Sequence, residues 1–175
     1  FRSLDTYYKT LDDLQNAQDV KNEGGTRRAF GGLLEAIGKK RKWILVEEAG
    51  KKSTRSSRTV YPDGTLRDTW KLPHAYWEAK DTDDDLDAEI DKKKGRGYPL
   101  DNIIFEDTQT AVLYQDGAEE YRSDVRDRER FATLLTRYVN HEIEPFEDFE
   151  DAITSYSKQV KGIAESLKEK IEGAH

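Results

Sequence analysis

The stretch 61-YPDGTLRDTWKLPHAYWEAKD-81 has the pattern of two strands joined by a turn, which would form the centre of a sheet. Pro73 and the polar residues beside it indicate the turn. Residues 75–80 alternate across the two faces of the second strand. We therefore expect an antiparallel hairpin within this stretch.

The alternation places Glu78 and Lys80 on the same face of that strand. If the hairpin turns near residues 71–72, Lys80 lies opposite Asp63 and Glu78 lies opposite Thr65. Two carboxylates and an ammonium group then meet at one end of the sheet. Two carboxylates, with backbone carbonyls and water, provide the hard oxygen ligands that Mg²⁺ requires.

Five aspartates follow the strand at once, and they have a simpler interpretation than metal binding: Asp81, Asp83, Asp84, Asp85 and Asp87. Acidic residues favour the positive end of a helix dipole, and Asp can cap free amides there. We expect these aspartates to begin a helix and to have no catalytic role.

Apolar spacing and turn residues in the rest of the chain predict three more strands and four helices. We expect helices over 3–22, from a cap at Thr26 to Gly38, over 84–97 and over 124–140, and strands over 42–50, within 51–70, and over 75–81, 102–108 and 110–117. This order predicts an α/β fold, a mixed five-stranded sheet flanked by helices.

The charge and composition of the chain limit the partners and the cellular environment that we expect. The 175 residues carry a net charge of −7, which weighs against non-specific DNA affinity, so DNA contacts would need local basic runs. Three such runs are present, at 38–42, 51–58 and 92–97, the last with Lys93, Lys94 and Arg96. The chain has no Cys, no signal peptide and no long apolar stretch, so we expect a reducing, cytoplasmic environment and no membrane partner.

Several familiar active sites are absent from the sequence. Neither glycine-containing segment, 24–32 or 49–53, has the phosphate-loop pattern of nucleotide-binding proteins. The three histidines, His74, His141 and His175, lack metal-ligand spacing, and there is no Gly-x-Ser-x-Gly turn. Serine and zinc hydrolases are therefore disfavoured.

Pro62-Asp63, followed by Glu78-Ala79-Lys80 and set in the order helix, three strands, helix and further strands, resembles the PD-(D/E)xK nuclease superfamily. The resemblance covers residues 26–140 and implies a restriction-endonuclease-like core. The longer string from Tyr61 to Gly117 is also similar to the N-terminal nuclease domains of single-chain restriction-modification enzymes, in which a nuclease precedes an adenine methyltransferase.

The resemblance implies that Asp63 and Glu78, with the Ala79 carbonyl, hold Mg²⁺, for which Mn²⁺ substitutes. Lys80 would position the attacking water or help to deprotonate it. The metal would polarise the scissile phosphate and stabilise the charge that develops on it.

Two further residues are candidates for the same site. The family often adds an acidic residue from the preceding helix, and Glu35 is the candidate here, although a lone helical Glu is ordinarily a solvated residue. Asp68 competes with Asp63 as metal ligand, since its shorter spacing to Glu78 also occurs in the superfamily; the expected hairpin favours Asp63.

The resemblance also predicts the domain organisation. Residues 1–145 would form the nuclease domain, and residues 146–175 a helical linker toward a downstream domain. A near-heptad seam in this segment fits equally a helix packed on the domain and a linker or docking helix: Phe149, Ile153, Tyr156, Val160, Ile163 and Leu167. A start at Phe1, the absence of Met and an end within a helical pattern lead us to expect a piece of a longer polypeptide.

We therefore expect a Mg²⁺-dependent endonuclease domain that hydrolyses phosphodiester bonds in double-stranded DNA. Its partners would be the methyltransferase and DNA-recognition domains of the same polypeptide. Two alternatives come from other classes: an inactive nuclease-fold module that binds DNA or docks a domain, and a structural helical adaptor. A lone Glu-x-Lys is usually just a surface ion pair. The nuclease hypothesis therefore depends on Asp63 lying beside Glu78 and Lys80.

Overall fold

A computed structural model describes residues 2–17, 23–48, 50–52 and 59–142, together with the separate positions 153, 156, 157 and 160. The chain divides into two compact units, residues 1–143 and residues 144–175. In the second unit the four described residues are helical, and Ile153, Tyr156 and Val160 are exposed. The rest of the predicted heptad seam lies outside the described residues, so the linker remains a prediction.

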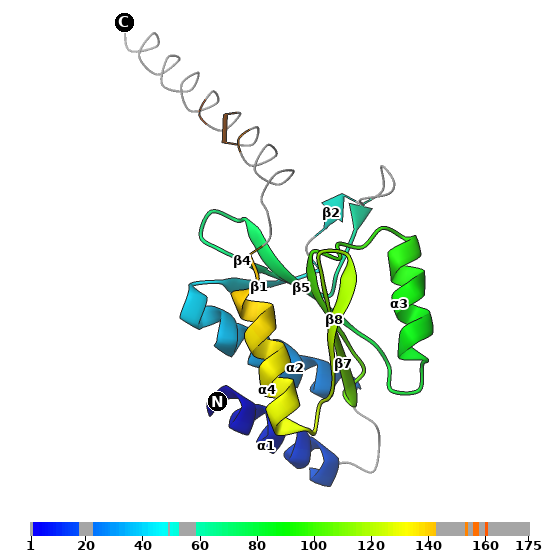
Figure 1. Ribbon diagram of the computed structural model, residues 1–175. Coiled ribbons are helices and arrows are strands. Elements are labelled where there is room, and N and C mark those ends of the chain that lie inside the picture. The colour runs from blue at the N-terminus through cyan, green and yellow to red at the C-terminus, as the bar shows by residue number, and fades with distance from the viewer. Residues whose placement is uncertain are drawn as a thin grey trace, which may run out of the picture. The chain divides into compact units, whose positions relative to one another are not determined.

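The first unit contains helices on both faces of a sheet (Figure 1). Its helices are α1 (Arg2–Ala17), α2 (Glu23–Gly38), the short 3₁₀ helix η1 (Lys39–Arg41), α3 (Leu86–Gly95) and α4 (Arg128–Asn140). Its strands are β1 (Ile44–Glu47), β2 (Lys51–Lys52), β3 (Thr59–Val60), β4 (Gly64–Arg67), β5 (Pro73–Ala79), β6 (Asn102–Glu106), β7 (Thr110–Gln115) and β8 (Ala118–Asp124).

Six strands form the main sheet in the order β1-β4-β5-β6-β7-β8, and β2 and β3 pair separately. The β5–β6 pair is parallel and the other neighbours are antiparallel, so the predicted mixed α/β sheet is confirmed. The sheet has six strands where we expected five. The additional strand, β8, was missed because its sequence, AEEYRSD, is charged and mostly exposed, as is common at a sheet edge.

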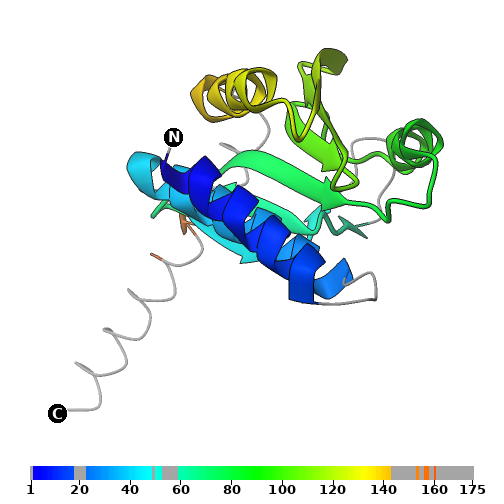
Figure 2. The ribbon, with the colours of Figure 1, turned by 90° about the horizontal axis from the view of Figure 1, so that it is seen from below.

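Two apolar layers hold the sheet to its helices. Helices α1, α2 and α4 cover one face, where the residues of one buried cluster include Phe30, Trp77 and Phe131. Helix α3 covers the other face, where Tyr76, Ile90 and Phe105 belong to a second cluster. Figures 1 and 2 show α3 on the side of the sheet opposite to α1 and α2. Both layers require aromatic side chains, which supply large buried areas.

The structure corrects two predicted helix starts. Helix α2 begins at Glu23, so Thr26 lies inside the helix and is not its cap. Gly24 and Gly25 lie in its first turn, where packing of the apolar face of the helix outweighs their low helix propensity. Helix α4 begins at Arg128, after an N-cap at Asp127 whose side chain accepts a hydrogen bond from the Arg130 N–H.

The β4–β5 hairpin is antiparallel, as expected, but its register differs from the prediction by two residues. Thr65 pairs with Tyr76, not with Glu78, and Gly64 pairs with Trp77. An irregularity between Leu66 and Arg67 accompanies this change. A shift of two residues leaves every side chain on its predicted face.

No helix among the described residues is both long enough and apolar enough to span a membrane.

Candidate active site

Asp63 and Glu78 meet where β4 begins and β5 ends. The Asp63 N–H donates to Glu78 Oε2 at 3.3 Å, and the Ala79 N–H donates to Asp63 Oδ2 at 2.8 Å. With Gly64 opposite Trp77, the register continues to place Asp63 opposite Glu78. The backbone thus holds the two predicted carboxylates side by side.

Two lysines contact the same oxygen of Glu78. Lys80 Nζ lies 3.0 Å from Glu78 Oε1, and Lys93 of α3 donates to that oxygen as well. Glu78 is only 2% exposed, so both ammonium groups compensate for a charge that has little access to water. Lys80 also lies 3.8 Å from Glu89 Oε2 on α3. The predicted Glu78–Lys80 pair is therefore present, and it is buried.

Lys93 is the main residue that the sequence analysis misplaced. We expected it in a solvated basic run, but its side chain is buried and its Nζ also donates to Tyr98 Oη at 3.0 Å. Tyr98 in turn donates to the Tyr61 carbonyl at 3.0 Å. The signal was its spacing: Leu86, Ile90 and Lys93 follow one another at four and three, along the buried face of α3.

Arg27 was also missed. It lies in α2, and its guanidinium forms an ion pair with Asp63 Oδ1. The apolar face of α2 begins at Phe30, three residues later, so the helical spacing already placed Arg27 toward the sheet. Three cationic side chains, Arg27, Lys80 and Lys93, thus contact two carboxylates.

Burial raises the pKa of Asp63, and the neighbouring charge of Glu78 raises it further. The Ala79 N–H, Arg27 and Lys80 oppose this shift without cancelling it. Burial, with the charges of Glu78 and Asp63, also raises the pKa of Tyr98 to about 12. Burial, more than the neighbouring carboxylate, is therefore what disfavours the charged form of Asp63.

A third carboxylate, Glu106, lies at the end of β6 and is buried. Its oxygens accept hydrogen bonds from Trp77 Nε1 at 3.2 Å and from the Thr108 N–H at 2.8 Å. Burial raises the pKa of Glu106 to about 7, and the charges of Asp107 and Asp63 raise it to a smaller extent. The hydrogen bonds from Thr108 and Trp77 lower the pKa without cancelling the effect of burial. The Glu106 carbonyl accepts the Lys80 N–H at 2.7 Å, which ties β6 to the end of β5.

A hollow of about 260 Å³ opens beside the carboxylate pair. Its lining includes Arg27, Ala79, Lys80 and Glu106. A second hollow is lined by Arg27, Asp63 and Trp77. Lys80 and Asp63 therefore each line a hollow on the side where α2 begins, whereas Glu78 lines neither of these two hollows.

The structure does not bring Asp68 or Glu35 to this cluster. Asp68 lies in the β4–β5 turn, where its carboxylate accepts hydrogen bonds from the Trp70 and Leu72 N–H groups and contacts His74 Nε2. Strand β4 separates it from Asp63, a span of roughly 16 Å. Glu35 is exposed on α2, eight residues beyond Arg27 and roughly 12 Å further along the helix.

The donor set suits a magnesium ion that also binds a substrate. The described part of the chain holds no group of three or more His, Cys, Asp or Glu side chains placed to bind a metal. Mg²⁺, however, is commonly held by one or two carboxylates, with water and substrate phosphates completing its octahedron. Asp63 and Glu78, joined through backbone hydrogen bonds, provide two such carboxylates.

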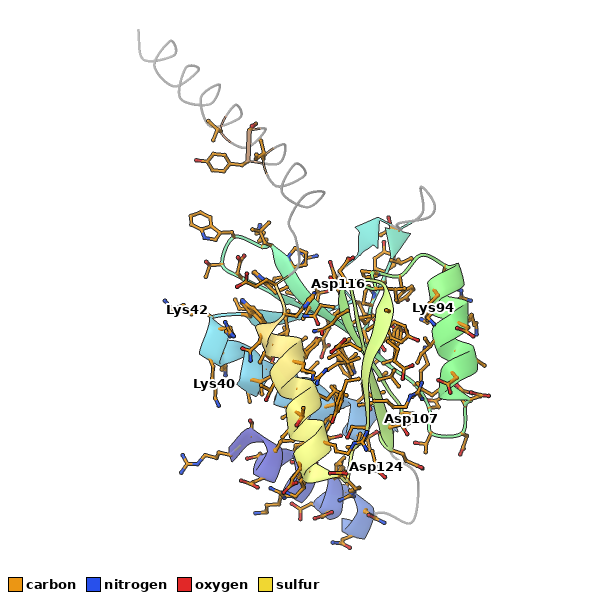
Figure 3. All side chains as sticks on the ribbon, viewed as in Figure 1. Lys40, Lys42, Lys94, Asp107, Asp116 and Asp124 are labelled. Atoms are coloured by element: carbon orange, nitrogen blue, oxygen red, sulfur yellow. The ribbon has the colours of Figure 1, made fainter. Side chains whose placement is uncertain are left out.

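The aspartates after β5 begin a helix, as predicted. Asp85 is the N-cap of α3, and its Oδ1 accepts from the Asp87 and Ala88 N–H groups at 3.0 and 3.2 Å. Most of the predicted basic run 51–58, namely residues 53–58, lies outside the described residues. Lys40 and Lys42, from the run 38–42, lie beyond the end of α2 (Figure 3). Lys94, on α3, forms an ion pair with Asp91, and its ammonium group lies over the face of the Tyr114 ring.

Comparison with known proteins defines the class of fold. The mixed six-stranded sheet with flanking helices is a restriction-endonuclease-like core. A chain in the cryo-EM structure of a DrdV–DNA complex is similar to this protein, with 35% sequence identity and a TM-score of 0.78. The match covers 99% of this chain and 17% of that one, so this protein spans about a sixth of its neighbour's length. No protein-family model matches the sequence, and no curated protein matches it.

Proposed function

We propose that the first unit is a Mg²⁺-dependent DNA endonuclease domain of the PD-(D/E)xK type. The observation that carries the proposal is the meeting of Asp63, Glu78 and Lys80 at one end of a restriction-endonuclease-like sheet. The complex of that neighbour with DNA supports DNA as the substrate, and we take double-stranded DNA as its form. Coverage of only 17% of that chain supports a place within a larger restriction-modification polypeptide, with methyltransferase and DNA-recognition domains elsewhere.

The carboxylates of Asp63 and Glu78 and the carbonyl of Ala79 would hold the metal ion. When bound, Mg²⁺ supplies polarisation of the scissile phosphate and stabilises the charge that develops on its oxygens. Lys80 is held 3.0 Å from Glu78 Oε1 and would orient the attacking water and assist removal of its proton. Attack of the water oxygen on phosphorus breaks one P–O ester bond and leaves a phosphate monoester and a free hydroxyl.

Lys93 would act as a positioning residue for Glu78. Its ammonium group is fixed by Tyr98, whose hydroxyl is in turn fixed by the Tyr61 carbonyl. This chain of hydrogen bonds holds Glu78 Oε1 from the α3 side, while Lys80 reaches it from β5. A side chain held on two sides keeps its orientation when a ligand arrives.

The test is cleavage of duplex DNA in Mg²⁺ by the full-length polypeptide that carries this domain. We expect Glu78→Ala and Lys80→Ala each to slow cleavage by about 100-fold or more, since each removes a group acting at the reacting phosphate. Glu120→Ala is the matched control, because Glu120 pairs with Arg137 on the surface, near the opposite end of the sheet. Undiminished cutting by both site variants would refute the proposal.

A second candidate is an inactive module that keeps the nuclease fold and binds DNA or another domain. It is favoured by the three cations that already neutralise the two carboxylates. Calorimetry with Mn²⁺ or Mg²⁺ separates the candidates. Metal binding that is lost in Asp63→Ala supports the enzyme, and no metal binding even with DNA present supports the module.

A further inference from the structure

Arg27 differs from the other two cations of the site in its exposure. Its side chain is 47% exposed, whereas those of Lys80 and Lys93 are 14% and 10% exposed. The lysines are held between β5 and α3, but Arg27 extends from α2 across the mouth of the site. Because the guanidinium is half-exposed, it stays solvated when it leaves Asp63, and a bound metal ion would replace its charge at that carboxylate.

The position of Arg27 also conflicts with metal binding at Asp63. Asp63 Oδ2 accepts the Ala79 N–H, and Oδ1 is the oxygen that pairs with the guanidinium. A divalent cation on Oδ1 would sit beside a positive charge, and the repulsion between them is strong where water is partly excluded. Asp63 is 15% exposed, so solvent screens this repulsion only in part.

The same guanidinium lines both hollows beside the carboxylates. One hollow includes Ala79 and Lys80, and the other includes Asp63 and Trp77. From one helix position Arg27 therefore reaches the space that a phosphate must occupy to contact Lys80. Arginine is suited to that role, because its planar fork binds phosphate oxygens in pairs.

We propose that Arg27 is a phosphate-binding residue that metal binding releases: it pairs with Asp63 in the metal-free site and turns to a DNA phosphate beside the scissile bond once a divalent cation is bound. This inference rests on the proposed nuclease function. Because the guanidinium must leave Asp63 for either ligand, metal and DNA each strengthen binding of the other. Such coupling is reciprocal by thermodynamic necessity.

The test measures metal and DNA binding separately in Arg27→Gln of the full-length polypeptide. Mn²⁺ affinity without DNA, followed by the electron paramagnetic resonance signal of free Mn²⁺, should rise by roughly 2- to 5-fold, because a competing cation is gone. Affinity for a duplex that the wild type cuts, measured in Ca²⁺, should fall by roughly tenfold. The plot of log affinity against log salt should lose a slope of about 0.9, one phosphate contact.

Two further variants serve as controls for the Arg27→Gln measurements. Arg27→Lys keeps the charge and should restore most of the salt slope without the full DNA affinity, since Lys lacks the planar fork. Arg137→Gln is the matched control: its side chain is 43% exposed and pairs with Glu120, and it should leave Mn²⁺ binding at the site unchanged. Equal thermal midpoints for Arg27→Gln and Arg137→Gln would exclude misfolding as the cause of a difference.

The Arg27→Gln variant should bind Mn²⁺ more tightly and DNA more weakly. A purely structural role of Arg27 would not produce these opposite changes. If Arg27→Gln binds Mn²⁺ no better than the wild type, or binds DNA with the same affinity and salt slope, the release of Arg27 is refuted while the nuclease proposal stands. If the wild type binds no Mn²⁺ that Glu78→Gln loses, both the inference and the proposed function are refuted.

Discussion

Asp63 and Glu78 are separated by 15 residues in the chain, yet the Asp63 N–H donates to Glu78 Oε2 at 3.3 Å. The hydrogen bond from the Ala79 N–H to Asp63 Oδ2 completes the link in the other direction. Each carboxylate is thus held by the backbone beside the other, and neither depends on a mobile loop for its place.

Asp68 organises the β4–β5 turn, so its loss should affect stability and leave metal binding intact. Asp68→Ala removes an acceptor of the Trp70 and Leu72 N–H groups, and we expect unfolding free energy to fall by about 1–2 kcal/mol. Urea denaturation measures the loss, with Thr69→Ala, an exposed neighbour, as control. Loss of Mn²⁺ binding in Asp68→Ala would instead identify Asp68 as a ligand.

Lys93 should be coupled energetically to Glu78. Lys93→Met leaves Glu78 with one ammonium partner in a buried site, and we expect a loss of about 3 kcal/mol in unfolding free energy. The loss should shrink by more than half when Glu78 is already Gln, as a double-mutant cycle would measure. Lys92→Met, which removes an exposed ion pair with Glu89, should cost less than about 1 kcal/mol. Additive losses in the cycle would contradict the contact.

Glu106 should make the fold less stable as the pH rises. Its pKa is about 7 in the folded protein and 4.5 in the unfolded chain, so the folded state binds more protons between these values. Stability is therefore lost as the pH rises from 4.5 through 7, by about 3 kcal/mol in total. Glu106→Gln has no such charge to bury.

Urea denaturation at pH 5 and pH 8.5 tests this. Relative to Glu106→Gln, the wild type should lose about 2 kcal/mol of unfolding free energy between the two pH values. Using the variant as reference cancels the titration of other groups that both proteins share. Parallel behaviour of the two proteins across this range would show that Glu106 keeps an ordinary pKa.

Asp85 should be the one aspartate after β5 that matters for α3. Asp85→Ala removes the acceptor of two N–H groups, and we expect a loss of about 1 kcal/mol. Asp84→Ala makes the same change of charge one residue earlier and should cost less than about 0.5 kcal/mol. Equal losses would mean that charge near the helix dipole, and not the cap, stabilises the start of α3.

Side-chain spacing in the sequence was enough to predict the mixed sheet and the face shared by Glu78 and Lys80, because alternation along a strand survives a shift of two residues. The spacing was not enough to predict which residues lie opposite one another on neighbouring strands. Glu78 was expected opposite Thr65, but the turn is centred earlier in the chain than expected, with Arg67 opposite Pro73, and Glu78 lies beside Asp63. Hairpin register depends on turn geometry, which residue types specify only weakly.

The positions of Lys93 and Arg27 could not be predicted from the sequence for a different reason. Both continue the apolar stripe of a helix at a position where the sequence has a cation, and such positions ordinarily carry solvated side chains. Only a carboxylate from another element makes the burial of Lys93 favourable, and that partner is not visible from spacing within α3. Strand β8 was missed for a related reason, since its edge position lets it remain polar.

The most direct test of the central claim is the number of Mn²⁺ ions bound by the full-length polypeptide, compared with its Glu78→Gln and Asp63→Asn variants. Electron paramagnetic resonance of free Mn²⁺, recorded with duplex DNA present, counts the bound ions. If Asp63 and Glu78 form a metal site, the wild type should bind at least one more ion than either variant, and Asp68→Asn should match the wild type. Equal binding by the wild type and both site variants would contradict the account.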